Sequence, residues 1–499
     1  MEKRQQPLWN PPDTCSSKIP ELYLYNSLTS KKERFIPQET GKVTWYSCGP
    51  TVYDSSHMGH ARTYIAFDIL RRTMQNYFNF NIYYVMNITD IDDKIIKRAR
   101  QRYLFDQFKQ EKHSYEEMKE YIRKAIEIVD AKSKTDPEPE KRTYLAQEAN
   151  RLKDLLASAS PGNTTPESLL EASGDALSDL VDKERGFTVS DFKIFESLPR
   201  FYENEFHEDM KALNILPPNH LVRVSEYIEP IIKFTQQIID NGFAYSTPSG
   251  SVYFDTNKFA QDPKHFYAKL VPTAFGDLNQ LAAGEGELSM AGEKKSQSDF
   301  ALWKASKSGE PAWDSPWGKG RPGWHIECSA MASGCLGESM DIHSGGVDLK
   351  FPHHDNELAQ SEACLGHSHW VRYFLHSGHL TIDNCKMSKS LKNFITIRQA
   401  LLQHSPRQIR LAFLLHGWKD TLDYGTNTMS EALALDRAFY DFTFNVSHLV
   451  SLALSQKPAQ CPVASSEQDN SAAYALVFEK CKAAVYSSLC GTWLPILST

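Results

Sequence analysis

A strand, a turn, a helix and a second strand follow one another near the N-terminus, and this succession limits the fold more than any other feature. Residues 43–48 are rich in β-prone side chains and end at a Gly-Pro turn. Apolar residues then recur at spacings of four, four and three from Ala66 to Tyr77, as on one face of a helix. Residues 82–86 are apolar on both faces, as in a buried parallel strand. The βαβ unit predicts an α/β fold with a doubly wound parallel sheet.

Composition excludes several classes of protein. The chain has 499 residues, 41% of them hydrophobic, which suits roughly three to four packed domains. Its net charge of −7 excludes a broad basic surface, so any contact with nucleic acid must be local. No run approaches the ~20 apolar residues of a membrane span, and residues 1–20 lack an apolar signal segment. Nine dispersed cysteines without a signal peptide indicate a reduced, cytoplasmic protein.

The sequence pattern divides the chain into seven segments. A charged stretch with weak helical periodicity interrupts the α/β pattern, which resumes after Pro322 and gives way to helices after Ile397. Beyond Ser455 the pattern decays into small and polar residues. The expected segments are an N-terminal extension (1–40), the first half of the catalytic domain (41–100), a helical insertion (101–199), a connecting domain (200–322), the second half of the catalytic domain (323–397), an incomplete helical bundle (398–455) and an irregular tail (456–499).

The first motif that carries chemistry is His57-Met-Gly-His60, at the start of the first helix. Imidazoles at positions i and i+3 share one face of a helix N-terminus. That end also presents free N–H groups and the positive end of the helix dipole, and Gly59 lets a ligand approach the backbone. The motif predicts a site for the α-phosphate of a nucleotide; the alternative is a pair of ordinary histidines at a helix start.

The second motif is Lys386-Met-Ser-Lys389-Ser, which follows a turn-prone Asp-Asn pair. Two lysines three residues apart, beside two hydroxyls, can bind β- and γ-phosphates and release them as pyrophosphate. The alternative is a solvated surface loop. The two motifs occur in this order, with a long insertion between them. Together they resemble the signature sequences of class I aminoacyl-tRNA synthetases.

A third group of residues suits a metal ion. Cys48 precedes the first motif, Cys328 lies far downstream, and His353 and Glu357 are one helical turn apart after a proline. Two thiolates, an imidazole and a carboxylate can bind zinc, which can accept the thiolate of a substrate and reject a hydroxyl. A closed structural zinc site and metal-free buried cysteines are the alternatives. His354 can also replace His353 by its spacing from Glu357.

From residue 22 to about residue 424 the chain resembles the cysteinyl-tRNA synthetase family, and most closely its eukaryotic cytosolic branch. The resemblance implies one zinc ion per chain, held by Cys48, Cys328, His353 and Glu357, and so favours His353 over His354. It rests on residues 48–54, 86–94, 300–304, 323–331 and 351–357.

The resemblance also implies roles for individual residues. Gly49 and Thr89 line the pocket for cysteine, Trp324 packs over it, and Lys389 contacts ATP together with His57 and His60. A Gly-rich turn at 344–348 can lie against the nucleotide through Gly345 and Gly346, with Asp348 accepting from ribose hydroxyls. The family usually has glycine where this chain has Ser344, and serine would be strained if that position requires a positive φ.

The implied activity is the ATP-dependent conversion of L-cysteine to cysteinyl-adenylate and its transfer to tRNA(Cys), with Mg2+ accompanying ATP. His57 and His60 would stabilise charge on the α-phosphate, and Lys386 and Lys389 the departing pyrophosphate. Neither the anticodon-binding domain nor the basic tail of the family is recognisable after about Val450. Two alternatives follow: a ligase that passes cysteine to a small-molecule amine, and a truncated interaction protein with weak transfer activity.

Overall fold

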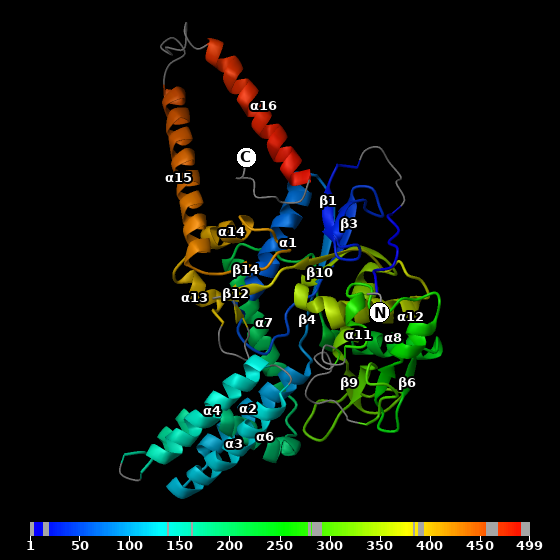
Figure 1. Ribbon diagram of the computed structural model, residues 1–499, viewed down its shortest axis with the longest axis vertical. Helices are drawn as coiled ribbons and strands as arrows, with labels where there is room; N and C mark the ends of the chain where they lie inside the picture. The colour runs from blue at the N-terminus through cyan, green and yellow to red at the C-terminus, as the bar shows by residue number, and fades with distance from the viewer. Residues whose placement is uncertain are drawn as a thin grey trace.

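The computed structural model describes residues 4–12, 19–136, 139–160, 163–277, 281, 292–382, 385–387, 394–455 and 468–490. Its centre is a parallel sheet of five strands in the order β11-β10-β3-β4-β5, which confirms the predicted α/β fold (Figure 1). The strands are β3 (Lys42–Ser47), β4 (Asn81–Ile88), β5 (His220–Arg223), β10 (Met340–Gly346) and β11 (Val371–Ser377).

The two faces of this sheet are covered by different helices. Successive side chains of a strand point to opposite faces, so Trp45 of β3 packs on one side and Tyr46 on the other. Trp45 belongs to a core shared with α1 (Met58–Asn76), whereas the core around Tyr46 contains α8 (Ile228–Asp240), α11 (Trp324–Leu336) and α12 (Asp355–Leu365). Both side chains are fully buried, as expected in a doubly wound fold.

The chain changes direction at β3. From β3 it proceeds through β4 to β5 on one side, whereas β10 and β11 lie on the other side. The carboxyl ends of β3 and β10 therefore flank the switch point of the sheet. In open α/β sheets this is the position at which ligands bind.

The insertion is helical, as predicted, and has a hydrophobic core of its own. It projects from the sheet at the lower left of Figure 1, and its buried residues include Phe108, Ile122 and Leu180. Helix α2 begins at Asp93 and runs through residue 101, the expected start of the insertion. The helices are α2 (Asp93–Gln110), α3 (Tyr115–Thr135), α4 (Pro139–Ser158), α5 (Pro166–Ala172) and α6 (Gly174–Arg185), and α7 (Ile194–Ala212) leads back to the sheet.

The connecting region contains an antiparallel sheet of four strands in the order β6-β7-β8-β9. Buried ion pairs join it to the insertion: Asp93 of α2 lies 3.0 Å from Lys304 and 3.1 Å from Arg321. The Gly-rich stretch at 282–286 lies outside the described residues. The strands are β6 (Ala244–Ser246), β7 (Val252–Phe254), β8 (Phe300–Ala305) and β9 (Gly320–Pro322), and helix α9 (Thr256–Gln261) follows β7.

The C-terminal region is mostly helical, but the expected irregular tail is wrong in part. Helix α16 covers Gln468–Cys490, a stretch without glycine or proline, and its end packs on the sheet domain through Cys490, which is 7% exposed. The other elements are β12 (Leu380–Ile382), β13 (Cys385–Lys386), α13 (Ile397–Leu401), α14 (Pro406–Leu414), β14 (Leu422–Asp423) and α15 (Thr426–Ser455), while β1 (Tyr23–Asn26) and β2 (Lys31–Arg34) form a hairpin near the N-terminus.

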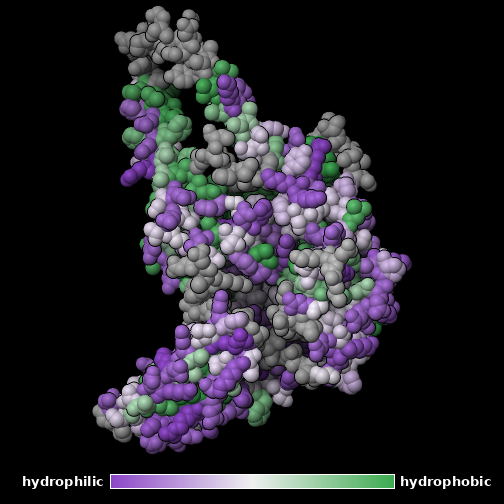
Figure 2. Space-filling view, viewed as in Figure 1, coloured by the Kyte–Doolittle hydropathy of each residue, from purple (hydrophilic) through white to green (hydrophobic). Residues whose placement is uncertain are grey.

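Helix α15 has two unlike halves. Its first half packs on α14, whereas its second half exposes Phe442, Phe444 and Leu449 at 66%, 62% and 62%. In Figure 2 the surface of α15 is accordingly rich in apolar residues, whereas the surface of the insertion is mostly polar. Among the helices of the described residues, none has the length and apolar character needed to cross a membrane.

Candidate functional site

His57 and His60 lie together at the N-terminus of α1, as the spacing predicts. The Nδ1 atom of His57 accepts a hydrogen bond from the Gly59 N–H at 3.1 Å, and the Nδ1 atom of His60 accepts one from the His57 N–H at 3.1 Å. The two rings stack with centroids 3.9 Å apart. Because both Nδ1 atoms accept, a neutral imidazole carries its proton on Nε2. Each histidine is therefore oriented as a donor at the helix start.

The second motif lies partly outside the described residues. The backbone of Lys386 belongs to β13, but residues 388–393, and with them Lys389, are not described. The chain that follows returns to the start of α1, since the Met58 N–H donates to the Ile395 carbonyl at 2.9 Å and the Phe394 ring lies 5.9 Å from that of His57. From residue 394 onward, the chain that follows the second motif therefore lies beside the first motif. The role expected for Lys389 stays a prediction.

The structure brings the four predicted metal ligands together at the carboxyl end of β3. The Cys48 sulfur lies 3.7 Å from the Cys328 sulfur, 3.7 Å from His353 Nε2 and 3.8 Å from Glu357 Oε1. His353 Nε2 lies 2.9 Å from Glu357 Oε1, because the two residues are one turn apart at the start of α12. All four side chains are buried. Two metal–sulfur bonds of about 2.3 Å at a tetrahedral angle would separate the sulfurs by about 3.8 Å, so this cluster could hold a tetrahedral metal ion.

His354 also belongs to this cluster by distance. Its Nε2 atom lies 3.3 Å from the Cys48 sulfur and 3.9 Å from Glu357 Oε1. One ligand atom from each of Cys48, His353, His354 and Glu357 lies within 4.8 Å of the others. The far nitrogens of the two imidazoles are held by other histidines, His353 Nδ1 by His325 at 3.1 Å and His354 Nδ1 by His376 at 2.7 Å.

The groups of the cluster shift one another's pKa values. Burial alone would raise the pKa of Glu357, but His343, at 2.7 Å, and His353 lower it to about 2. Burial would lower the pKa of His353, but Glu357 and Cys328 raise it to about 10. Burial raises the pKa of the Cys48 thiol well above its usual value, whereas the hydrogen bond from that thiol lowers the pKa of Cys328 to about 6. A cation bound here would therefore displace protons from Cys48 and His353.

The residues expected to line an amino-acid pocket surround this cluster. A side chain at Gly49 would lie 1.6 Å from the Asn87 carbonyl oxygen, so only glycine fits there. Thr89 donates to Glu327 Oε2 at 3.1 Å, and the Trp324 ring stacks on that of His353 with centroids 4.4 Å apart.

Two polar residues of this pocket were not singled out from the sequence. Asn87 accepts from the Gly49 N–H at 2.8 Å and donates to the Thr89 hydroxyl at 3.2 Å. Glu327 is 1% exposed, and burial raises its pKa well above the usual value, with Cys328 adding to the rise. A signal existed for both: Asn87 alternates with Thr89 at the end of a buried strand, and Glu327 is an acidic residue in a buried apolar helix.

The expected Gly-rich turn lies at the end of β10, on the other side of the switch point. Ser344, Gly345 and Gly346 are in fact part of that strand, and Asp348 lies in the 3-10 turn Val347–Leu349. Ser344 has no positive φ, and its hydroxyl accepts from the Trp45 indole N–H at 2.8 Å. The expected strain at Ser344 is therefore absent, because the residue is extended and its side chain is satisfied. A side chain at Gly345 would meet the His354 ring at 2.8 Å.

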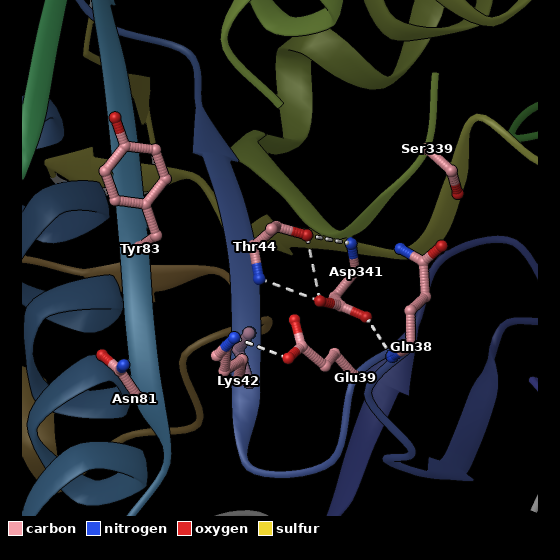
Figure 3. Close-up of a pocket in the computed structure, with 9 residues that line it drawn as sticks. Gln38, Glu39, Lys42, Thr44, Asn81, Tyr83, Ser339 and Asp341 are labelled. Carbon is pink, nitrogen blue, oxygen red and sulfur yellow. Dashed lines mark hydrogen bonds and ion pairs between the residues drawn. The ribbon is translucent and has the colours of Figure 1, made fainter. Parts of the chain in front are cut away.

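A polar pocket of about 260 Å³ lies at the opposite, amino ends of β3, β4 and β10 (Figure 3). At its base the Asp341 carboxylate accepts from the Gln38 N–H at 2.7 Å, the Thr44 N–H at 2.8 Å and the Thr44 hydroxyl at 3.0 Å. Burial raises the pKa of Asp341, and these donors oppose the rise. The pocket is separated from the metal cluster by the length of the strands.

Comparison with known proteins identifies the family to which this chain belongs. The family described as "tRNA synthetases class I (C) catalytic domain" matches residues 34–434. The chain is 56% identical to the "Cysteine--tRNA ligase, cytoplasmic" of Gallus gallus, with 90% of this chain and 61% of that protein covered. It is 53% identical to the protein of the same name from Drosophila melanogaster, with 98% and 68% covered. The chain thus spans about three fifths of the length of the chicken relative.

A solved structure supports the fold. Mycobacterium tuberculosis methionyl-tRNA synthetase in complex with methionyl-adenylate is 12% identical to the chain and superposes with a TM-score of 0.53, covering 91% of this chain and 80% of that one. At this identity the likeness concerns the fold alone. The family match over most of the sheet domain, together with relatives of more than 50% identity, shows that this chain belongs to the cysteine--tRNA ligase family of class I tRNA synthetases.

Proposed function

We propose that this chain uses ATP to convert L-cysteine to cysteinyl-adenylate and then transfers the cysteine to tRNA(Cys) in the cytoplasm. The observation that carries the proposal is the position of the Cys48, Cys328, His353 and Glu357 cluster. It lies at the carboxyl end of β3, at the same end of the sheet as the glycines of β10 and the histidine pair that opens α1. A site for a thiol and a site for a nucleotide are thereby adjacent.

The metal proposed for the cluster is zinc, one ion per chain. Two cysteine sulfurs with one imidazole and one carboxylate suit this ion, and the spacing of the sulfurs agrees with tetrahedral ligation. When bound, zinc would supply a coordination position for the substrate thiolate, which a serine hydroxyl fills poorly. His353 is the imidazole we assign as the ligand, because its Nε2 is the nearer of the two to Glu357.

Other residues of the chain would bind the cysteine and the nucleotide. Gly49 and Thr89 hold the cysteine, with Trp324 as a lid over the His353 ring. Gly345, Gly346 and Asp348 lie against the nucleotide. The carboxylate of cysteine attacks the α-phosphorus of ATP, a P–O bond to pyrophosphate breaks, and pyrophosphate leaves with its Mg2+.

Two pairs of side chains would stabilise that step. The Nε2 donors of His57 and His60 bind the α-phosphate oxygens as their negative charge grows. Lys386 and Lys389 would bind the departing pyrophosphate. No side chain acts as a nucleophile, so catalysis rests on orientation and electrostatics.

Cysteine-dependent exchange between ATP and pyrophosphate tests activation, and charging of tRNA with labelled cysteine on the same preparation tests transfer. We expect cysteine to be preferred over serine in exchange by about four orders of magnitude, the range for a site built around one polar contact. Comparable rates with the two amino acids would contradict selection through a metal. Exchange without tRNA charging would instead point to a ligase with another acceptor.

A further inference from the structure

Helix α2 carries a line of exposed cations on one face. Lys94, Arg98 and Arg102 follow one another at intervals of four residues and are all exposed. Side chains at this spacing lie one above another on a helix. Two other basic residues of the same helix form ion pairs within the insertion. Arg100 lies 2.9 Å from Asp182 in a buried pair, and Lys97 lies 3.8 Å from Asp179.

Arg98 and Arg102 have no ion pair among the residues that the structure describes. Negative charge is also present in this region, since Asp54 and Glu205 raise the pKa of Tyr202. Glu205 is already shared with Arg398, at 3.6 Å. Two exposed guanidinium groups without a carboxylate partner stand out on a chain whose net charge is −7.

Aromatic rings accompany this line of cations. Helix α7 packs beside α2 and presents Phe201, which is 55% exposed, and the half-buried Tyr202, whose ring lies edge-on at 5.1 Å from that of Phe201. Burial and Asp54 raise the pKa of Tyr202, whereas Arg98 and Arg102 lower it, as expected for cations on a helix that packs beside α7.

The line begins beside the candidate active site. The Lys94 ammonium lies 6.0 Å from the centre of the Tyr53 ring. Tyr53 comes four residues before His57 and follows Val52, whose N–H donates to the Thr89 carbonyl. From there the exposed face of α2 leads away from the sheet into the insertion, at the lower left of Figure 1.

We infer that Lys94, Arg98 and Arg102 of α2, with Phe201 and Tyr202 of α7, form a track for the single-stranded 3′ end of the tRNA. Guanidinium and ammonium groups bind the phosphates, and the aromatic rings offer stacking surfaces that suit bases of any sequence. A local basic track of this kind is also what an acidic protein needs to bind one arm of a nucleic acid. The inference rests on the proposed function and adds to it the path by which the acceptor end reaches the adenylate.

The test uses Arg98→Ala/Arg102→Ala in the full chain, beside Arg123→Ala/Lys124→Ala as a control. The control removes two charges from α3 of the same insertion, away from the track. The probes are two acceptor-stem hairpins, one ending in a single-stranded 3′ tail and one blunt. We expect the α2 variant to bind the tailed hairpin about tenfold more weakly at low salt. The slope of log Kd against log salt should fall by about 1.4, or about 0.7 for each phosphate contact that is lost.

The blunt hairpin decides between the track and a general electrostatic effect. Unchanged binding of the blunt hairpin, with unchanged binding of both hairpins to the α3 control, supports the track. An equal loss for both hairpins, or no loss for either, overturns it. Phe201→Ala should weaken only the tailed hairpin, since it removes stacking and no charge.

Activity measurements separate this inference from the proposed function. In the α2 variant the exchange between ATP and pyrophosphate should equal that of the wild type, while tRNA charging falls. A parallel loss of exchange would show that the arginines act on adenylate formation, and would overturn the track. If the wild-type chain has no exchange activity the proposed function fails, yet binding of the two hairpins still decides the track.

Discussion

The two ends of the central sheet both bury polar groups, but they satisfy them in different ways. At the amino ends the Asp341 carboxylate is surrounded by three donors, two of them backbone N–H groups. At the carboxyl ends Cys48, Cys328, His353 and Glu357 have mainly one another as partners, and their pKa values move in opposite directions. A buried acid whose oxygens accept hydrogen bonds from backbone N–H groups has a structural role. Titratable groups that converge on one another leave room for a cation or a substrate, which is typical of a functional site.

The largest effect is expected for Cys328→Ser. This change removes a sulfur 3.7 Å from Cys48, and we expect purified protein to fall from about one zinc per chain to well below it, with cysteine-dependent exchange lost. Metal analysis and exchange on the same sample check this. Cys364→Ser is the matched control, because Cys364 is a partly buried cysteine outside the cluster. Full zinc content in the Cys328 variant would show that the metal binds at another site.

The next effect concerns the histidine pair. His60→Ala removes one donor at the start of α1, and should slow adenylate formation by about 10²–10³-fold while the zinc content and the affinity for cysteine hold. Single-turnover measurement of adenylate formation at saturating cysteine separates the two quantities. A collapse in cysteine affinity with an unchanged rate of the chemical step would reverse the assigned role.

A smaller effect is expected for Glu327→Gln. Glutamine can still accept from the Thr89 hydroxyl, so the fold of the pocket should persist. Burial favours the neutral form of Glu327, whereas the ammonium group of bound cysteine would favour its carboxylate. Because glutamine cannot ionise, we expect a rise in the KM for cysteine of about tenfold, or about 1.4 kcal/mol. Steady-state exchange at varied cysteine concentration measures it. An unchanged KM would show that Glu327, like Asp341, has a structural role.

The comparison predicts the least functional change for Asp341→Asn. The amide nitrogen of asparagine would face the donors of Thr44 or Gln38, which costs about 1–3 kcal/mol of unfolding free energy for the unsatisfied groups. Exchange activity per folded molecule should equal that of the wild type, because the carboxylate lies a strand's length from the switch point. Urea denaturation gives the first quantity and exchange the second. A loss of activity that exceeds the loss of folded protein would break the comparison.

The sequence predicted the central sheet and the residues at its carboxyl end better than the periphery of the molecule. The strand 43–48, the helix after His57 and the strand 82–86 could be predicted because each is a local pattern. The cluster of four candidate metal ligands could be predicted because these residue types suit one ion. The contacts of Glu357 with His343 and of His354 with His376 join residues on different elements, and no spacing reveals them. The glycines at 345 and 346 were expected in a turn because glycine favours turns, but the sheet pairing extends through both. Helix α16 was missed because its apolar residues follow no single face.

Helix α2 is one continuous helix that contacts both the connecting sheet and the core of the insertion. Its first residue, Asp93, is clamped to the connecting sheet by Lys304 and Arg321, while its later turns lie in the core of the insertion. A domain joined to its neighbour by loops can move independently of it. A domain that shares a helix with its neighbour passes its displacement on through that helix. The residues just before Asp93 connect it to Thr89, so a displacement of the insertion would reach the hydrogen bond between Thr89 and Glu327. The buried ion pairs of Asp93 are therefore the contacts through which a displacement of the insertion would reach the connecting sheet.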